Sequence, residues 1–342
     1  MKNSLFLVIF AFICFVSCSK DNETKISCEN GEVFGLKQDV NIAFSDIRIT
    51  VICPDLQLGS ISFISETIGY AVAAKRENQV WTNKLVKTID AGNSWTDIYE
   101  KEGVSLFDIH FFSEKIGVAL AEIDGKKFLL RIKDDGKSIS EHLIEGKEIS
   151  RKINFLNENI GFIGSGDRQL FSTFDGGKTW KTDNMNVGYY PTLSNYKGTI
   201  YLVGAEIVYT STDCGQNWTE NNPDFVKWIY GFGNYGDDFY IMADNLFKTD
   251  INFNSSVQKS TPARMHTLKP YDENTIIGFG SNYVGGEAPI GIIYLSNDAG
   301  KTWVSYYGDE FSLGINKVIW YNDKNAYILS DLGTLTRITI NK

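Results

Sequence analysis

The sequence predicts an all-β protein formed by a single seven-bladed β-propeller. Three observations support this fold class. An eight-residue turn motif recurs along the chain, its spacing matches a four-stranded blade, and short β-branched and aromatic runs fill the intervals. No window shows the sustained periodicity of an amphipathic helix. A mature chain of about 320 residues would often form two domains, but a regular internal repeat predicts one.

The recurring motif reads Ser/Thr-x-Asp-x-Gly-x-Ser/Thr-Trp. Four clear copies and two degenerate copies occur, and successive aspartates lie 37 to 48 residues apart. This spacing is the period of a propeller blade. The positions that define the copies are Asp90, Gly92, Trp95, Asp134, Gly136, Asp175, Gly177, Trp180, Asp213, Gly215, Trp218, Asp250, Asp298, Gly300 and Trp303.

We expect these aspartates to be structural rather than catalytic. A carboxylate that opens a tight turn can accept hydrogen bonds from backbone N–H groups two or three residues further on. The glycine supplies a positive φ without steric cost, and the tryptophan buries a large face. The Gly-Lys-Thr found in two copies is not a phosphate loop, because the glycine that such a loop needs five residues earlier is absent.

A second pattern precedes the turn motif and supplies the first two strands of a blade. It is clearest where Ile61-Ser62-Phe63 leads to Ile68-Gly69-Tyr70, and similar runs begin at Ile109 and Ile153. The predicted blades span 60–99, 106–144, 152–183, 191–220, 229–260, 264–307 and 317–342. The last has only three strands, so we expect residues 46–52 to add its fourth strand and close the ring, since an open sheet edge is a liability.

The N-terminus predicts an exported lipoprotein. Residues 1–17 combine a basic start, about a dozen apolar residues and a small residue before Cys18, which describes a signal peptide. The string 15–18 resembles a lipobox, so we expect lipidation of Cys18, with plain secretion as the alternative. Residues 18–35 then form a lipidated acidic tether and residues 36–342 the propeller. The tether resembles that of surface lipoproteins of Bacteroidetes, which implies the outer membrane, at the cell surface or the periplasmic face.

Charge and residue usage exclude several kinds of partner. The formal net charge is −9, whereas nucleic acid needs a basic footprint. Anionic lipid is excluded on the same ground, so the N-terminal lipid is the only membrane contact expected. The three histidines lack the spacing of metal ligands, so we expect no metal. We also expect no cofactor, and we expect the protein to be a monomer. In an oxidising compartment, Cys28 and Cys53 could form a disulfide, and two free buried thiols are the alternative.

The turn motif resembles the Asp box, also called the bacterial neuraminidase repeat, over roughly residues 46–342. Such boxes occur in sialidases, xyloglucan-cleaving glycosidases, sortilin-type receptors and the photosystem II stability/assembly factor family. The Ile-Gly-Tyr-Ala-Val run and the turn at 173–180 are most similar to the assembly-factor type. In that family a seven-bladed ring is a binding scaffold without known catalysis, so the resemblance implies fold more strongly than function.

The expected function is therefore a non-catalytic binding or assembly scaffold at the cell envelope, with a protein, peptide or glycan partner. Loops opposite the Asp boxes are the expected binding surface, because glycine-bearing loops on a rigid scaffold often carry function. The candidate residues on that face are Arg76, Arg168, Tyr190, Trp228, Arg264, Tyr283 and Glu287.

The alternative function is a glycoside hydrolase, although the sequence favours a protein that is not an enzyme and names no catalytic residue. A sialidase needs three arginines around the sugar carboxylate, and this chain has only seven arginines and no Arg-Ile-Pro start. A glycosidase with two catalytic acids needs a defined carboxylate pair, and no spacing singles one out.

Overall fold

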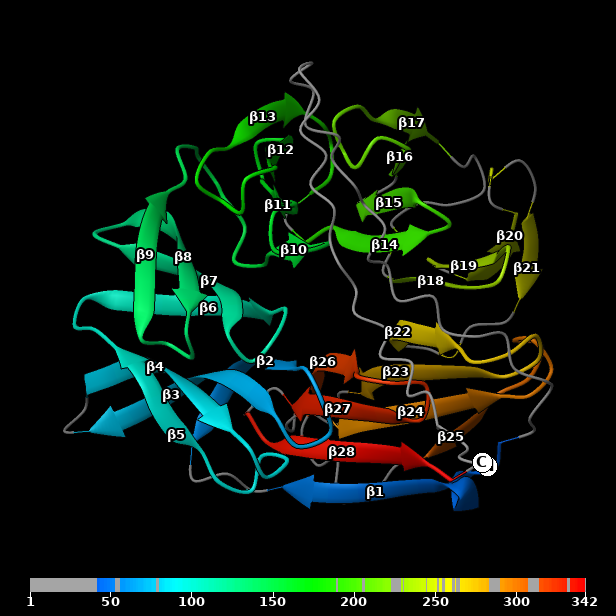
Figure 1. Cartoon of the computed structure of the whole chain (residues 1–342). Helices are drawn as coiled ribbons and strands as arrows, with labels where there is room; N and C mark the ends of the chain where they lie inside the picture. The colour runs from blue at the N-terminus through cyan, green and yellow to red at the C-terminus, as the bar shows by residue number, and fades with distance from the viewer. Residues whose placement is uncertain are drawn as a thin grey trace, which may run out of the picture.

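Seven four-stranded antiparallel sheets form a ring in the computed structural model of the chain (Figure 1). The structure describes residues 42–52, 56–77, 80–188, 190–204, 207–222, 229, 231–243, 245–250, 252–253, 256–259, 262, 265–282, 290–306, 314–330 and 333–341. The first strand of each blade lies nearest the centre of the ring. The all-β, seven-bladed fold predicted from the repeat is therefore confirmed.

Each of the first six blades is formed by four consecutive strands. Blades 1 to 3 consist of β2 (Gln57–Phe63), β3 (Gly69–Glu77), β4 (Val80–Thr88), β5 (Thr96–Glu100), β6 (Val104–Phe111), β7 (Ile116–Ile123), β8 (Lys126–Lys133), β9 (Ser138–Leu143), β10 (Asn154–Phe155), β11 (Gly161–Gly164), β12 (Gln169–Thr173) and β13 (Lys181–Asn184). Blades 4 to 6 consist of β14 (Thr192–Tyr196), β15 (Thr199–Gly204), β16 (Ile207–Ser211), β17 (Thr219–Asn221), β18 (Gly231–Tyr235), β19 (Asp238–Met242), β20 (Leu246–Thr249), β21 (Ser256–Lys259), β22 (Met265–Pro270), β23 (Ile276–Asn282), β24 (Ile290–Ser296) and β25 (Val304–Tyr306).

Blade 7 combines the two ends of the propeller. It contains β26 (Ile315–Trp320), β27 (Asn325–Ser330) and β28 (Leu335–Ile340), and its outer strand is β1 (Ile47–Ile52), which follows the short 3-10 helix η1 (Phe44–Asp46). β1 runs antiparallel to β28, from Ile47 opposite Ile340 to Ile52 opposite Leu335 (Figure 1). The predicted closure by an N-terminal strand is confirmed.

The Ile-Gly pattern of the second strands has a packing reason. A phenylalanine that ends the first strand lies directly over the glycine, and a Cβ at Gly69 would come within 2.5 Å of the Phe63 ring. Gly117 and Gly161 leave the same room in blades 2 and 3. Because that space is free, Phe63 also stacks on Tyr327 of blade 7, with ring centroids 3.7 Å apart. Each glycine thus allows an aromatic contact between neighbouring blades.

The Asp boxes connect the third and fourth strands, and their aspartates hold the turn. Asp175 accepts hydrogen bonds from the Thr173 hydroxyl at 2.9 Å, the Thr179 hydroxyl at 2.6 Å and the N–H groups of Lys178 and Thr179 at 3.0 Å. The Trp180 indole N–H donates to the Gly177 carbonyl at 3.2 Å. Burial opposes ionisation of Asp175, but these donors outweigh it and lower the pKa of the carboxyl below its ordinary value of 3.8.

The two degenerate copies also turn the chain through left-handed residues. In blade 2 the chain takes positive φ values at Asp134, Asp135 and Gly136. The Asp134 carbonyl accepts the Lys137 N–H at 3.3 Å, and no hydrogen bond of the Asp134 carboxylate is recorded among the described residues. In blade 5, Asp250 accepts the Asn252 N–H at 2.9 Å. Among the described residues of that turn, Phe253 is left-handed, one place beyond the asparagine that the motif aligns with glycine.

Comparing these two kinds of box gives a stability prediction. We expect Asp175→Asn to lower the free energy of unfolding by about 1 kcal/mol, since it replaces hydrogen bonds to an ionised carboxylate by weaker bonds to a neutral amide oxygen. We expect the control Asp134→Asn to change it by less than about 0.5 kcal/mol, because asparagine tolerates the left-handed backbone. Urea denaturation measures both. Equal effects of the two substitutions would contradict the role assigned to the intact box.

Candidate functional site

The two faces of the ring are defined by their turns. We call box face the side with the Asp boxes and with the turns between the first and second strands. These turns touch the boxes: the Ala91 N–H donates to the Thr67 carbonyl at 2.9 Å, and the Gly176 N–H donates to the Asn159 carbonyl at 2.8 Å. We call loop face the opposite side, with the turns between the second and third strands and the connections between blades. The sequence placed the candidate site on the loop face.

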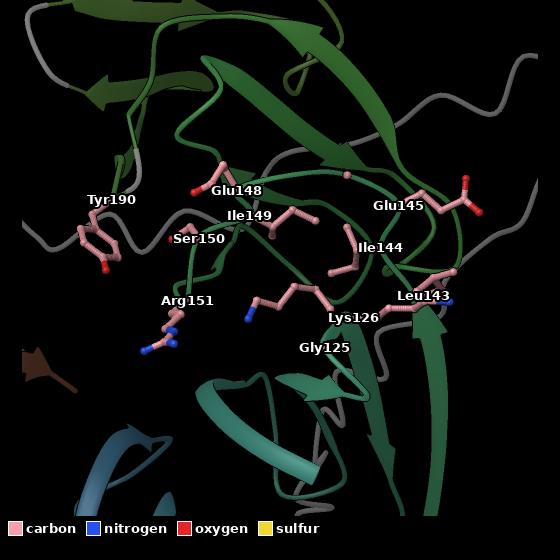
Figure 2. A pocket seen from close by; sticks show the side chains of 12 residues that line it. Gly125, Lys126, Leu143, Ile144, Glu145, Glu148, Ile149, Ser150, Arg151 and Tyr190 are labelled. Atoms are coloured by element: carbon pink, nitrogen blue, oxygen red, sulfur yellow. The ribbon is translucent and has the colours of Figure 1, made fainter. Parts of the chain in front are cut away.

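A hollow of about 670 Å³ lies on the loop face between blades 2 and 3 (Figure 2). It is lined by residues 125–127, 143–146, 148–151 and Tyr190, which come from the β7–β8 turn and from the connections before and after blade 3. Tyr190 and Arg151 lie on one side of the hollow, and Leu143 and Glu145 lie on the other. Its volume is within the range of pockets that hold small ligands.

Exposed apolar side chains mark the two sides of this loop-face hollow. Tyr190 is 60% exposed and Leu143 is 39% exposed. Only three other large hydrophobic side chains of the described ranges are exposed, namely Ile89, Val257 and Val304. Single exposed hydrophobic residues are common, but two across one hollow provide apolar contact for a ligand.

Cations stacked on aromatic rings surround the same hollow. The Lys127 ammonium lies 4.3 Å and the Arg151 guanidinium 4.7 Å from the centroid of the Phe107 ring. The Lys152 ammonium is 5.1 Å from the Tyr190 ring. Lys127 also forms an ion pair with Glu122, whereas no ion pair is recorded for Arg151 in the described part of the chain. Arg151 is thus placed to meet an acidic group of a ligand.

A bulge in the first strand of blade 2 explains the position of Phe107. The pairing of β6 with β7 shifts register between Leu106 and Asp108, so Phe107 is an extra residue in the strand. Such a bulge changes the direction of neighbouring side chains. It leaves Phe107 half-buried beside the hollow and Asp108 buried.

Asp108 joins four blades. Its carboxylate accepts the Ser60 hydroxyl of blade 1 at 2.5 Å, the Ile153 N–H of blade 3 at 3.0 Å and the Lys317 ammonium of blade 7 at 3.0 Å. Burial raises the pKa of Asp108, but the charge of Lys317 and the hydrogen bonds outweigh burial, and the net pKa is lowered. The carboxylate therefore stays ionised and links the ring where it closes.

Burial is the main cause of the lowered pKa values of two neighbouring groups. Burial lowers the pKa of Lys152, with Lys317 adding repulsion and Asp108 opposing the shift. Burial, reinforced by Lys317, lowers the pKa of His110 to about 4. His110 is therefore neutral at physiological pH.

The residues predicted to form the site do not all lie at the loop-face hollow. Tyr190 lines the loop-face hollow. Arg168 is exposed on the β11–β12 turn with φ 58° and does not line it. The backbone of Arg76 lies in β3, but its side chain is outside the description. Also outside the described residues are Trp228, Arg264, Tyr283, Glu287, Cys18, Cys28 and Cys53.

Sequence reasoning missed several residues of the site. The repeat shows that three of them share one position, directly before the apolar residue that starts the first-strand motif: Asp108, Lys152 and Lys317. This shared position could have been inferred from the sequence. The contact of Arg151 with Phe107 was not readable, because it depends on the bulge. Cys214 is also disulfide-bonded, a state the sequence did not single out, and its partner is outside the described part.

Comparison with known proteins identifies the fold. No protein-family model and no curated protein matches the sequence. A solved structure of YCF48 bound to D1 peptide matches with a TM-score of 0.61 and 18% identity, over 89% of this chain and 99% of that chain. YCF48 from Cyanidioschyzon merolae matches with a TM-score of 0.62 and 16% identity, over 86% and 99%. The chain has the fold of a YCF48-type β-propeller.

The YCF48-type fold is shared with proteins of other kinds. A GH74 enzyme from Niastella koreensis matches with a TM-score of 0.54 and 17% identity, over 83% of this chain and 52% of that chain. BamB from Moraxella catarrhalis matches with a TM-score of 0.54 and 9% identity, over 82% and 85%. These identities establish fold alone. Within the described ranges of this chain, no helix is long and apolar enough to cross a membrane, and no three His, Cys, Asp or Glu residues are grouped to hold a metal.

Proposed function

We propose that the protein is a non-catalytic scaffold that binds a peptide segment of a partner protein in the loop-face hollow. The observation that carries this proposal is the pair of exposed apolar side chains, Tyr190 and Leu143, on opposite sides of a hollow that Arg151 also borders. Tyrosine and arginine are the residue types most enriched where binding energy is concentrated. The lipid expected on Cys18 would hold this scaffold at the cell envelope.

The chemistry of the hollow indicates what the peptide carries. Tyr190 and Leu143 favour an apolar or aromatic side chain, since contact would remove both from water. Arg151 has its guanidinium against Phe107, so it presents donors to a carboxylate with little loss of conformational entropy. YCF48 bound to D1 peptide supports the proposal, because it is a propeller of this type with a peptide ligand.

A displayed library of random short peptides tests the proposal. We expect selection for peptides that combine an apolar and an acidic residue. Tyr190→Ala should weaken their binding about 30-fold, since truncating an aromatic side chain that contacts the ligand costs roughly 2 kcal/mol. Isothermal titration calorimetry with the purified protein measures the dissociation constants.

The matched control removes an exposed apolar side chain elsewhere. Val257 is 58% exposed on β21 and is remote in sequence from the hollow. We expect Val257→Ala to leave peptide binding unchanged. Failure to select any peptide, or equal binding by the Tyr190→Ala variant and the native protein, would refute the proposal.

A further inference from the structure

The box face has its own hollow at the centre of the ring. It has a volume of about 870 Å³ and is bounded by the ends of β2, β6, β10 and β26, by the turns after these four strands and by residues 193–195 of β14. None of the loop-face residues proposed to bind peptide lines it. The box-face hollow is therefore a separate site, although the sequence directed attention to the other face.

Four neutral polar side chains form an arc along one wall of this hollow. Ser62, His110, Asn154 and Ser194 come from four consecutive blades and line the hollow together. They occupy equivalent positions, because their partners in the second strands are Tyr70, Val118, Phe162 and Tyr201. The propeller symmetry thus places one polar group from each of blades 1 to 4 on the same level of the channel.

Each member of the arc has hydrogen-bonding capacity left. The Ser62 hydroxyl accepts the Phe111 N–H at 2.9 Å, which leaves its own proton to donate. Asn154 donates to the Pro191 carbonyl at 3.1 Å, which leaves its side-chain oxygen to accept. Within the described part of the chain, no side-chain hydrogen bond is recorded for His110 or Ser194. The arc therefore offers both donors and acceptors.

The arc carries no net charge. The low pKa of His110 keeps its imidazole neutral, so one ring nitrogen donates and the other accepts. Lys317 also lines the hollow, but its ammonium is paired with Asp108 at 3.0 Å. Glu158 is the remaining charged residue of the lining. A neutral ligand therefore fits this wall better than an ionic one.

Partly exposed apolar groups flank the arc. Phe112, Leu156 and Tyr321 are the first turn residues after their strands, and all three border the hollow. They provide flat, apolar surface next to the polar wall. A ligand with one polar edge and one apolar face is complementary to both.

We propose that the box-face hollow binds a neutral oligosaccharide. A sugar ring has hydroxyl groups around its edge and C–H groups on its faces, which match the polar arc and the flanking apolar residues respectively. An extended peptide would instead take its hydrogen bonds from one continuous strand edge. Here the available groups are side chains on four separate sheets arranged around an arc. The volume accommodates two or three sugar units, as in ordinary ligand pockets of about 300–1,000 Å³.

The test uses the purified protein and a panel of trisaccharides. Maltotriose, cellotriose, mannotriose and chitotriose are the neutral probes, and trigalacturonic acid is the charged one. Saturation-transfer NMR detects binding, and titration calorimetry measures the dissociation constant. We expect at least one neutral trisaccharide to bind at millimolar concentration or below, and to bind more tightly than the acid.

Substitutions in the arc test whether the sugar binds there. Ser194→Ala and His110→Ala should each weaken the neutral sugar about tenfold, because each removes a hydrogen bond to the ligand. Ser194 has no recorded structural hydrogen bond, so its variant should keep the native melting temperature. Tyr190→Ala, on the opposite face, should bind the sugar normally.

Three results would overturn this proposal. They are no binding by any neutral trisaccharide, equal binding of the acidic one, and sugar binding that both arc variants leave intact. Because Tyr190→Ala should weaken peptide binding and leave sugar binding unchanged, failure of the sugar proposal can be distinguished from failure of the peptide proposal.

Discussion

Asp108→Ala is expected to lower the free energy of unfolding by about 3–5 kcal/mol, as breaking a buried ion pair by removing one partner usually does. The Asp108 side chain is only 8% exposed, and Lys317 is 30% exposed. Alanine would leave the Lys317 ammonium without its carboxylate and would leave the Ser60 hydroxyl and the Ile153 N–H without an acceptor. Since these groups belong to blades 7, 1 and 3, the loss weakens the ring where it closes. Urea denaturation measures the effect.

An exposed ion pair formed by Glu141 of the same blade is the control for Asp108. Glu141 accepts the Lys101 ammonium at 2.6 Å, and their side chains are 33% and 49% exposed. We expect Glu141→Ala to cost less than about 1 kcal/mol, as surface pairs do. If the two variants were equally stable, the buried pair would have no special role in closing the ring.

The stabilising effect of Asp108 has a defined pH dependence. Its pKa in the folded protein lies below the ordinary value of 3.8, so the folded state favours the ionised form. The contribution is fully present above that ordinary value and is lost as the pH falls through the folded pKa. The stability difference between the native protein and Asp108→Ala should therefore narrow as the pH falls below 3.8.

Cys214→Ala is the second substitution with a large expected effect, about 2–5 kcal/mol lower stability under non-reducing conditions. Cys214 is 2% exposed in the Asp box of blade 4 and is disulfide-bonded. All other cysteines are at position 53 or earlier, so the disulfide closes a loop of more than about 160 residues. In the chain-entropy account, such a long loop strongly restricts the unfolded state.

The repeat supplies an internal reference for this substitution. Alanine occupies the equivalent box position at Ala91 and Ala299, with φ 63° and 56°, and Cys214 has φ 63°. Cys214→Ala therefore introduces a residue that this backbone already accepts twice. A reductant should lower the melting temperature of the native protein and leave that of the variant unchanged. A variant as stable as the native protein, or one equally sensitive to reductant, would contradict this prediction.

The fold was predictable because its determinants recur locally along the chain. The Asp box, the Ile-Gly strand and their spacing each lie within one blade, so reading one blade is enough to find the rest. The closing strand was predictable by elimination, since blade 7 lacked a strand and one β-type run lacked a partner. The structure confirms both.

The site was less predictable because its contacts are not local. Asp108 and Lys317 lie 209 residues apart, and only ring closure brings them together. The placement of Phe107 depends on a bulge, which hydrophobic periodicity does not record. Of the loop residues predicted to bind, Tyr190 lines the hollow and Arg168 does not, because side-chain directions in loops follow no simple period.

The pairing of β1 with β28 has a consequence for biogenesis. The strand that completes the last sheet is translated first, and the strand it pairs with is translated last. During synthesis β1 therefore waits with both edges unpaired while six blades emerge. Unpaired β edges promote aggregation, and closing so long a loop is slow. A nascent or C-terminally truncated chain should consequently be a chaperone client, and only the finished chain should be released from this dependence.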